Sequence, residues 1–250
     1  ANSIVGLSQL GNDVGFIGKV NDDDLGQKYE DGLQKEKVNF LYSKKDEPTP
    51  TGTCLILITP DSERTMCTFL GTAGKVNDKD VDSDQIKKAE ITFLEGYLWD
   101  EGEPKKAFDK AILNSNKVAM SLSDLFCVER HKAQFLELMK NKLDIIFANE
   151  QEILSLTDSK SFDEAVTFLK NLNKSVIITR GEKGAMAVNK NEVVECAAAK
   201  NLNITDLTGA GDLFAAGYLH GVINHKTVKE SLEKGTELSA KIIQKIGARI

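Results

Sequence analysis

The residues with the clearest chemical potential lie in the segment 203–220, where a polar stretch passes into an apolar one. Gly209, Ala210 and Gly211 form a run of small residues just before the apolar stretch, which has the composition of a helix. Backbone N–H groups at the start of a helix lack partners within the helix, and the helix dipole adds partial positive charge there. Because small residues let an anion approach the backbone, this run predicts a cradle for a phosphate group.

Asp212 follows the small residues directly and is unexpected in that place, because its carboxylate would repel a bound anion. Two interpretations stay open at this point. Either the carboxylate takes part in the chemistry of the bound group, or the segment is only a capped helix start whose glycines allow close packing.

Two other segments carry groups suited to a nucleotide and its metal ion. Gly181 and Gly184, in the string TRGEKG, follow a predicted strand and would let the backbone turn sharply beside phosphates or a ribose. A plain turn between two strands explains that string equally well. Asn149 and Glu152 open a predicted helix, and their oxygens suit Mg²⁺, directly or through water. Acidic residues in a first helical turn also stabilise the helix dipole without any ligand.

Composition excludes several classes of protein. The 250 residues are 41% hydrophobic and 28% charged, which is ordinary for a soluble globular chain. A net charge of −6 gives no general attraction to nucleic acid or to an anionic membrane. No apolar stretch approaches the ~20 residues that a membrane span needs. Four scattered cysteines and three histidines argue against a zinc site or a disulfide framework, so we expect reduced thiols and a cytoplasmic protein.

The elements that must position these groups alternate between helix and strand. The chain opens without an initiator Met and directly in helical periodicity, which suggests a processed or trimmed fragment. Helices are expected at 2–10, 24–35, 82–89, 104–114, 129–141, 151–156, 162–172, 211–222 and 228–246. Strands are expected at 14–20, 91–94, 118–122, 145–147 and 176–179, followed by a hairpin of 185–189 and 192–196. This pattern predicts a three-layer α/β/α fold with a mostly parallel central sheet, whose ligands gather at the carboxyl ends of the strands.

Residues 36–71 interrupt this alternation. Three β-rich segments, at 38–43, 52–59 and 64–70, are separated by turn residues and predict a small antiparallel sheet. We expect residues 1–35 and 72–250 to form the nucleotide- and substrate-binding core, and residues 36–71 to form a β lid that excludes water from the site. A hairpin extension without such a role is the alternative. Arg64 lies on this insert and could reach a transferring phosphate if the lid closes.

Together these segments resemble the ribokinase-like (pfkB-type) family of sugar and nucleoside kinases. DLTGAGDLFAAG, at 206–217, is similar to that family's C-terminal signature DTTGAGDxFxxG, from which only Leu207 departs. Residues 149–152 resemble the family's NxxE string, and residues 179–184 resemble its strand-end glycine loop. Residues 2–11 resemble the end of the N-terminal signature, without its di-glycine and without the preceding strand that supplies a substrate-binding Asp.

The resemblance implies a ribokinase-like fold, with ATP and Mg²⁺ as cofactors and a mechanism of phosphoryl transfer. Asp212 would act as general base on a substrate CH₂OH group as it attacks the γ-phosphoryl of ATP. The cradle amides and Arg64 would stabilise the charge that develops on the transferred group. The remaining roles implied by the resemblance are nucleotide binding by Thr179, Gly181, Gly184, Asn149 and Thr208, magnesium binding by Glu152, and substrate binding by Asn2.

Within the family, two strings are more similar to adenosine kinases than to ribokinases: PTGTC at 50–54 and SLSDLF at 121–126. An adenosine-like nucleoside is therefore the favoured acceptor, and a free sugar such as ribose or fructose is the alternative. A protein that binds a nucleotide or metabolite without catalysis is a more distant one. A nicotinamide oxidoreductase is disfavoured, because Gly209 lies near the C-terminus and Phe214 occupies the third glycine position of the expected fingerprint. A monomer or a homodimer is expected.

Overall fold

The computed structural model describes residues 1–60, 64–99 and 102–250. These residues divide into two compact units. Unit 1 combines residues 1–76 with 199–250, and unit 2 spans residues 77–198. Across the described residues, no helix has both the length and the apolar character needed to cross a membrane.

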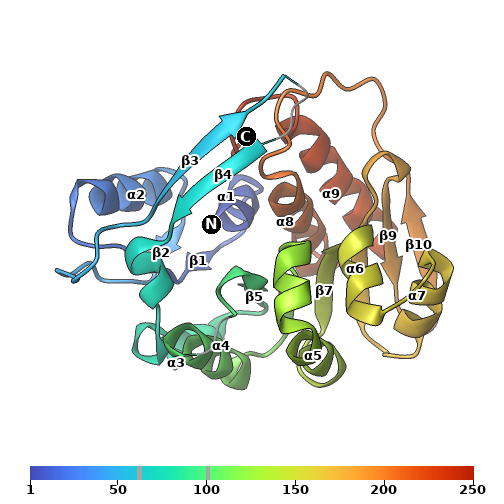
Figure 1. Cartoon of the computed structure of the whole chain (residues 1–250), viewed down its shortest axis with the longest axis horizontal. Helices are drawn as coiled ribbons and strands as arrows, with labels where there is room; N and C mark the ends of the chain where they lie inside the picture. The colour runs from blue at the N-terminus through green and yellow to red at the C-terminus, as the bar shows by residue number, and fades with distance from the viewer. Residues whose placement is uncertain (61–63, 100–101) are drawn as a thin grey trace. The chain divides into compact units, whose positions relative to one another are not determined.

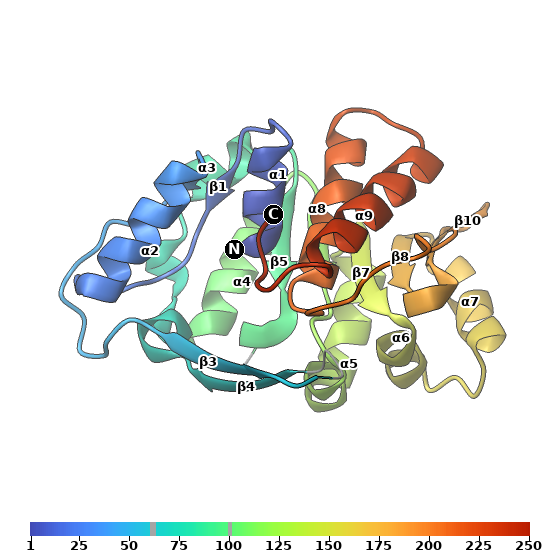
Figure 2. The same ribbon diagram turned by 90° about the horizontal axis from the view of Figure 1, so that it is seen from above.

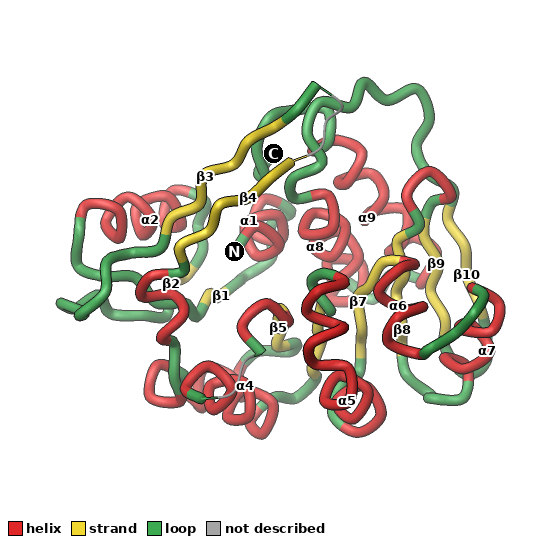
Figure 3. Tube along the Cα trace, in the orientation of Figure 1, coloured by secondary structure: helices red, strands yellow, loops and turns green. Residues whose placement is uncertain are grey.

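Unit 2 is built on a mixed β-sheet whose described strands lie in the order β10-β9-β8-β7-β6-β5 (Figures 1 and 3). The strands are β5 (Thr92–Glu95), β6 (Val118–Ser121), β7 (Ile145–Asn149), β8 (Ser175–Thr179), β9 (Ala185–Val188) and β10 (Val193–Cys196). Strands β5 to β8 are parallel, and β9 and β10 continue the sheet antiparallel. The structure thus confirms the strands and the hairpin that were expected from the sequence. The short apolar runs of the parallel strands are typical of strands that are buried on both faces.

Most helices of unit 2 begin after a residue whose side chain accepts a hydrogen bond from an N–H group of the first turn, whereas Gly102, before the helix at 103–114, provides no such cap. The helices are α3 (Ser83–Lys88), α4 (Glu103–Asn114), α5 (Leu125–Asn141), α6 (Glu150–Thr157) and α7 (Phe162–Lys170), with 3-10 turns η2 (Asp78–Asp80), η3 (Gly96–Leu98) and η4 (Gly181–Lys183). Asp124 accepts a hydrogen bond from the amide of Cys127, so α5 begins four residues earlier than expected. Phe135 of α5 is fully buried in the core of the unit.

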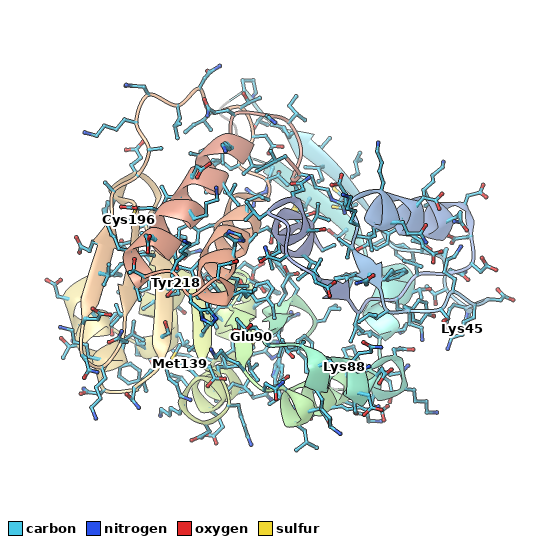
Figure 4. All side chains as sticks on the ribbon, turned by 180° about the vertical axis from the view of Figure 1, so that it is seen from behind. Lys45, Lys88, Glu90, Met139, Cys196 and Tyr218 are labelled. Atoms are coloured by element: carbon cyan, nitrogen blue, oxygen red, sulfur yellow. The ribbon has the colours of Figure 1, made fainter. Side chains whose placement is uncertain are left out.

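Unit 1 is organised around α8 (Ala210–Ile223), a helix that is apolar on every side. Residues 213–219 are all buried, and Tyr218, labelled in Figure 4, is only 2% exposed. A helix of this composition must be covered all round. It packs against α1 (Asn2–Gln9) and α9 (Val228–Ile242). Unit 1 also contains α2 (Asp24–Lys35), η1 (Gly71–Lys75), a hairpin described below, and a parallel pair of short strands, β1 (Gly15–Phe16) and β2 (Asn39–Phe40).

The expected insert contains a hairpin of β3 (Thr53–Ile58) and β4 (Arg64–Phe69), whose residues are all exposed within the described structure (Figure 2). The Asp23 carboxylate, which caps α2, also accepts a hydrogen bond from the Thr51 amide at 2.9 Å and so ties down the base of the hairpin. Of the turn expected at 60–63, residues 61–63 lie outside the described residues.

The prediction of three consecutive antiparallel strands is wrong for the first of them. Strand β2 pairs with β1 in parallel and not with the hairpin. The reason lies in burial, since Val38 and Tyr42 are 3% and 8% exposed and belong to the core of unit 1. A functional division into a core and a lid at 36–71 stays a prediction.

Close contact between α8 and α9 depends on glycine. A methyl group on Gly217 would lie 2.6 Å from the carbonyl oxygen of Lys234 and 2.7 Å from the Cα of Gly235. We therefore expect Gly217→Ala to lower the free energy of unfolding by about 1–3 kcal/mol, because overpacking outweighs the better helix propensity of alanine. Gly32→Ala in α2 is the matched control, since no atom lies within 4 Å of the added methyl group. Urea denaturation should show the control unchanged or stabilised, and equal stability of both variants would contradict the packing argument.

Candidate functional site

The start of α8 has the form that the run of small residues predicted. Gly209 is the N-cap residue, and its φ of +81° is one that glycine adopts without strain. It provides no side-chain cap for the helix. A side chain at Gly211 would meet open space, since no atom lies within 4 Å of its Cβ position. The first turn of α8 is therefore accessible to an anion at the positive end of the helix dipole.

Asp212 lies in this first turn and is held by the start of a second helix. The side-chain amide of Asn2 donates a hydrogen bond to Oδ2 of Asp212 at 2.9 Å, and the hydroxyl of Ser3 donates one to Oδ1 at 3.3 Å. Ser3 is only 1% exposed. Both donors are neutral side chains, so they orient the carboxylate without placing a positive charge on it. The structure brings the predicted residues Asn2 and Asp212 together, 210 positions apart in the sequence.

Ser3 was not among the residues that the sequence indicated. Its place in the first turn of α1 is visible in the sequence, but no spacing rule connects residue 3 with residue 212. Only the packing of α1 on α8 makes this contact.

The loop before α8 is fixed by a buried carboxylate. Asp206 is 1% exposed and accepts hydrogen bonds from the backbone amides of Thr208 at 2.8 Å and Gly247 at 2.9 Å. Burial raises the pKa of Asp206, but hydrogen bonds from Thr208 and Gly247 and the positive charge of Arg64 outweigh it and hold this pKa below its ordinary value. Arg64, exposed at the start of β4, thus acts on this loop electrostatically, while Thr208 is buried beside Asp206.

In unit 2, Asn149 and Glu152 form a reciprocal capping box at the start of α6. The Asn149 side chain accepts from the Glu152 amide, and the Glu152 carboxylate accepts from the amide and the side chain of Asn149 at 2.9 and 2.6 Å. Glu152 is 4% exposed. Burial raises its pKa to about 7, and the nearby charge of Asp124 adds to this rise against the hydrogen bond from Asn149.

The strand-end glycine loop connects β8 to β9, which are antiparallel, so it is a turn between strands as well as a candidate nucleotide site. Gly184 has a φ of +89°, and a methyl group there would lie 2.0 Å from the carbonyl oxygen of Cys196. Arg180 donates to Glu150 at 2.9 Å, and its guanidinium lies 4.0 Å from the Phe162 ring centroid. Hydrogen bonding to Arg180 lowers the pKa of Glu150, so this carboxylate is neutralised locally.

Thr179 and Gly181 complete the predicted residues of this loop. Thr179 ends β8, and its hydroxyl lies 3.5 Å from the carbonyl oxygen of Ala148 on the neighbouring strand. Gly181 opens η4 with a φ of +56°, and no atom lies within 4 Å of its Cβ position. Thr179 therefore lies at the carboxyl end of a parallel strand and Gly181 just after it, where ligands of open α/β sheets gather.

The string SLSDLF follows β6 at the same end of the sheet. Ser123 adopts a φ of +78°, which is uncommon for a residue with a side chain. Phe126 is 65% exposed, and Tyr97, whose hydroxyl donates to the Ser123 carbonyl at 3.2 Å, is 51% exposed. The guanidinium of Arg130 lies 4.9 Å from the centroid of the Phe126 ring and occupies one of its faces. The ring surface that remains exposed on Phe126 and on Tyr97 is one on which a planar ring could stack.

No group of three His, Cys, Asp or Glu side chains that could hold a metal ion occurs among the described residues. The four cysteines are free, two of them exposed and two buried. A divalent cation would therefore depend on few protein carboxylates and on oxygens of a bound ligand, which is the usual arrangement for Mg²⁺ in phosphoryl-transfer sites.

Known proteins share the fold of this chain. An adenosine kinase from Sinorhizobium meliloti superposes with a TM-score of 0.96 and 36% sequence identity, over 100% of this chain and 78% of its own. A probable sugar kinase from Rhizobium etli superposes with a TM-score of 0.94 and 34% identity, over 99% and 77% of the two chains. An uncharacterized sugar kinase from Archaeoglobus fulgidus is 25% identical over 98% of this chain and 97% of its own length. These similarities confirm the predicted ribokinase-like α/β fold.

The model of the pfkB family of carbohydrate kinases matches residues 1–250. Its members are phosphotransferases with an alcohol group as acceptor, which excludes the oxidoreductase alternative for a chain matched over its whole length. This chain belongs to the pfkB family of carbohydrate kinases.

Proposed function

We propose that the protein is an ATP-dependent kinase that phosphorylates the CH₂OH group of an adenosine-like nucleoside, with Asp212 as general base. One observation carries the assignment: the Asp212 carboxylate lies in the first turn of α8, fixed by two neutral donors from α1. An acidic residue in the first turn would stabilise the helix dipole without any partner from another helix, so the two donors from α1 are the feature that points to a further role. The retained Asp212 also argues against a protein that only binds a ligand.

The reaction needs one proton acceptor and an anion site. The alcohol oxygen forms a bond to the γ-phosphorus of ATP, and the bond from that phosphorus to the oxygen of ADP breaks, leaving its electron pair on ADP. The alcohol proton passes to Asp212. Amides of Gly209, Ala210 and Gly211 stabilise the charge on the transferred phosphoryl group, and Arg64 adds positive charge.

Nucleotide binding is assigned to the strand ends of unit 2 and to Thr208. Thr179, Gly181 and Gly184 would line the nucleotide, with Asn149 beside them. Mg²⁺, when bound, neutralises charge on the phosphate oxygens. Glu152 suits this ion, because a buried carboxylate with a raised pKa and a second acid nearby gains most from a neighbouring cation. Asn149 donates hydrogen bonds to both carboxylate oxygens of Glu152, so Glu152 would hold the ion through water.

Two observations favour a nucleoside over a free sugar. The adenosine kinase from Sinorhizobium meliloti is 36% identical to this chain, and the exposed rings of Phe126 and Tyr97 are suited to stacking on a base. The alternative, a free sugar such as ribose or fructose, is supported by the relatives named as sugar kinases. An enzyme that consumes ATP and carries free cysteines fits the cytoplasm, and we expect it to work as a monomer or homodimer.

The base assignment is tested by Asp212→Asn. We expect kcat to fall by at least about 10²-fold, because a positioned general base contributes on that order. The melting temperature should shift by no more than a few degrees, since only the two hydrogen bonds from Asn2 and Ser3 are affected. Asp31→Asn, an exposed carboxylate on α2, is the control and should keep wild-type turnover. Wild-type turnover in Asp212→Asn would remove Asp212 from this role.

The acceptor is tested by a panel of adenosine, ribose and fructose with Mg-ATP. We expect kcat/KM for adenosine to exceed the values for both sugars by about 10²-fold or more, because a site built for a base loses its contacts with the shorter ligand. Formation of the phosphorylated product, followed by chromatography together with ADP, is the measurement. A higher kcat/KM for either sugar would show that this sugar, and not the nucleoside, is the acceptor. The assignment as a kinase would be unaffected.

Glu152 gives a prediction on stability. Its pKa of about 7 in the folded state exceeds the ordinary value of 4.5, so the folded state binds more protons between these values. Stability should therefore fall as pH rises from about 4.5 to 7, by roughly 3 kcal/mol at most, at about 1.4 kcal/mol per pKa unit.

Urea unfolding at pH 5 and pH 8 measures this effect. Glu152→Gln should lose clearly less stability between the two pH values than the wild type, whereas the exposed control Glu129→Gln should follow the wild type. Mg-ADP should reduce the difference in the wild type and not in Glu152→Gln. Identical pH dependence in all three proteins would show that Glu152 titrates normally.

A further inference from the structure

Residues 247–249, which follow α9, contact the candidate site in unit 1 at three points. The Gly247 amide donates to Asp206 at 2.9 Å. Ala248 packs against Gly209, so closely that a Cβ on Gly209 would lie 3.0 Å from its Cα. The guanidinium Nε of Arg249 donates to Oδ1 of Asn2 at 3.5 Å. This segment thus reaches the loop before α8, the N-cap of α8, and the residue that holds Asp212.

The contact of Arg249 has a chemical consequence for Asn2. A carboxamide has an oxygen that only accepts hydrogen bonds and an NH₂ group that only donates them. A guanidinium only donates, and a carboxylate only accepts. With Arg249 on one side and Asp212 on the other, the amide of Asn2 has one favourable orientation, in which its NH₂ group faces Asp212.

We propose that Arg249 is a positioning residue, which fixes the orientation of the Asn2 amide and through it the carboxylate of Asp212. The proposal rests on the proposed function of Asp212 as general base. In the flipped orientation the amide oxygen of Asn2 would face the carboxylate oxygen, and the two acceptors would repel each other. Arg249 disfavours this state from the far side of the amide.

The indirect arrangement also leaves the reacting oxygens available. A guanidinium bound directly to Asp212 would engage both carboxylate oxygens in a bidentate pair and compete with the substrate hydroxyl. Asn2 stands between them, so the positive charge orients the carboxylate without covering it. Ser3 contacts Oδ1 independently of Arg249 and therefore provides an internal comparison.

The test is a double-mutant cycle on kcat and KM, with the acceptor that gives the highest rate in the substrate panel. Arg249→Ala should lower kcat by about 5- to 20-fold, which lies within the range of coupling between residues in contact. In the background of Asn2→Ala, Arg249→Ala should change kcat by less than about twofold, because its target is gone. In the background of Ser3→Ala, the substitution Arg249→Ala should lower kcat by the same factor as in the wild type. Arg249→Lys should recover part of the loss, since an ammonium group also donates to Oδ1.

Lys245→Ala is the matched control, an exposed cation just before the segment, and should behave as the wild type. Melting temperatures of all variants should agree within a few degrees. Multiplicative effects of Arg249→Ala and Asn2→Ala would overturn the proposal, as would wild-type kcat in Arg249→Ala. Either of these two results would overturn the role of Arg249 only. The assignment of Asp212 as general base would still hold if Asp212→Asn is inactive. If Asp212→Asn is fully active, the base assignment fails on its own evidence and the role of Arg249 falls with it.

Discussion

The burial of α8 on all sides is the constraint on which the candidate site of unit 1 depends. An amphipathic surface helix can shift along its apolar face, but a helix that is apolar all round is held from every direction. Contacts as close as that of Gly217 with Gly235 leave no room for sliding. The N-terminus of α8 is therefore presented at a fixed place, and α1, packed on the same helix, places Asn2 and Ser3 next to Asp212.

The acidic residues of the two units differ in burial and in hydrogen bonding, and these differences suit them to different roles. Asp206 is buried but receives backbone hydrogen bonds that lower its pKa, so it serves as a fixed anchor for the loop. Glu152 is buried with fewer compensating bonds and has a raised pKa. Glu150 is neutralised by Arg180. Asp212 differs from all of them in being half-buried and oriented by neutral donors, which suits a group that must exchange a proton with a ligand.

Local patterns predicted the parts of this structure that local physics determines. The parallel strands of unit 2, the helix start at Asn149 and the helix start at Gly209 all follow from short runs of residues. The pairing of β2 with β1 was not predictable in this way, because it depends on where Val38 and Tyr42 are buried. Ser3 and Arg249 were missed for the same reason, since their partners lie about 200 or more positions away in the sequence.

The same long separations bear on how the protein is made. Asp212 is held by residues 2 and 3 from one side, and the segment 247–249 closes against Asp206 and Asn2 from the other. Contacts that span nearly the whole chain can form only after residue 249 has left the ribosome, and they carry the loop-closure cost of such spans. A nascent chain can therefore fold the sheet of unit 2 early, yet it remains without an assembled carboxylate site until synthesis has passed residue 249.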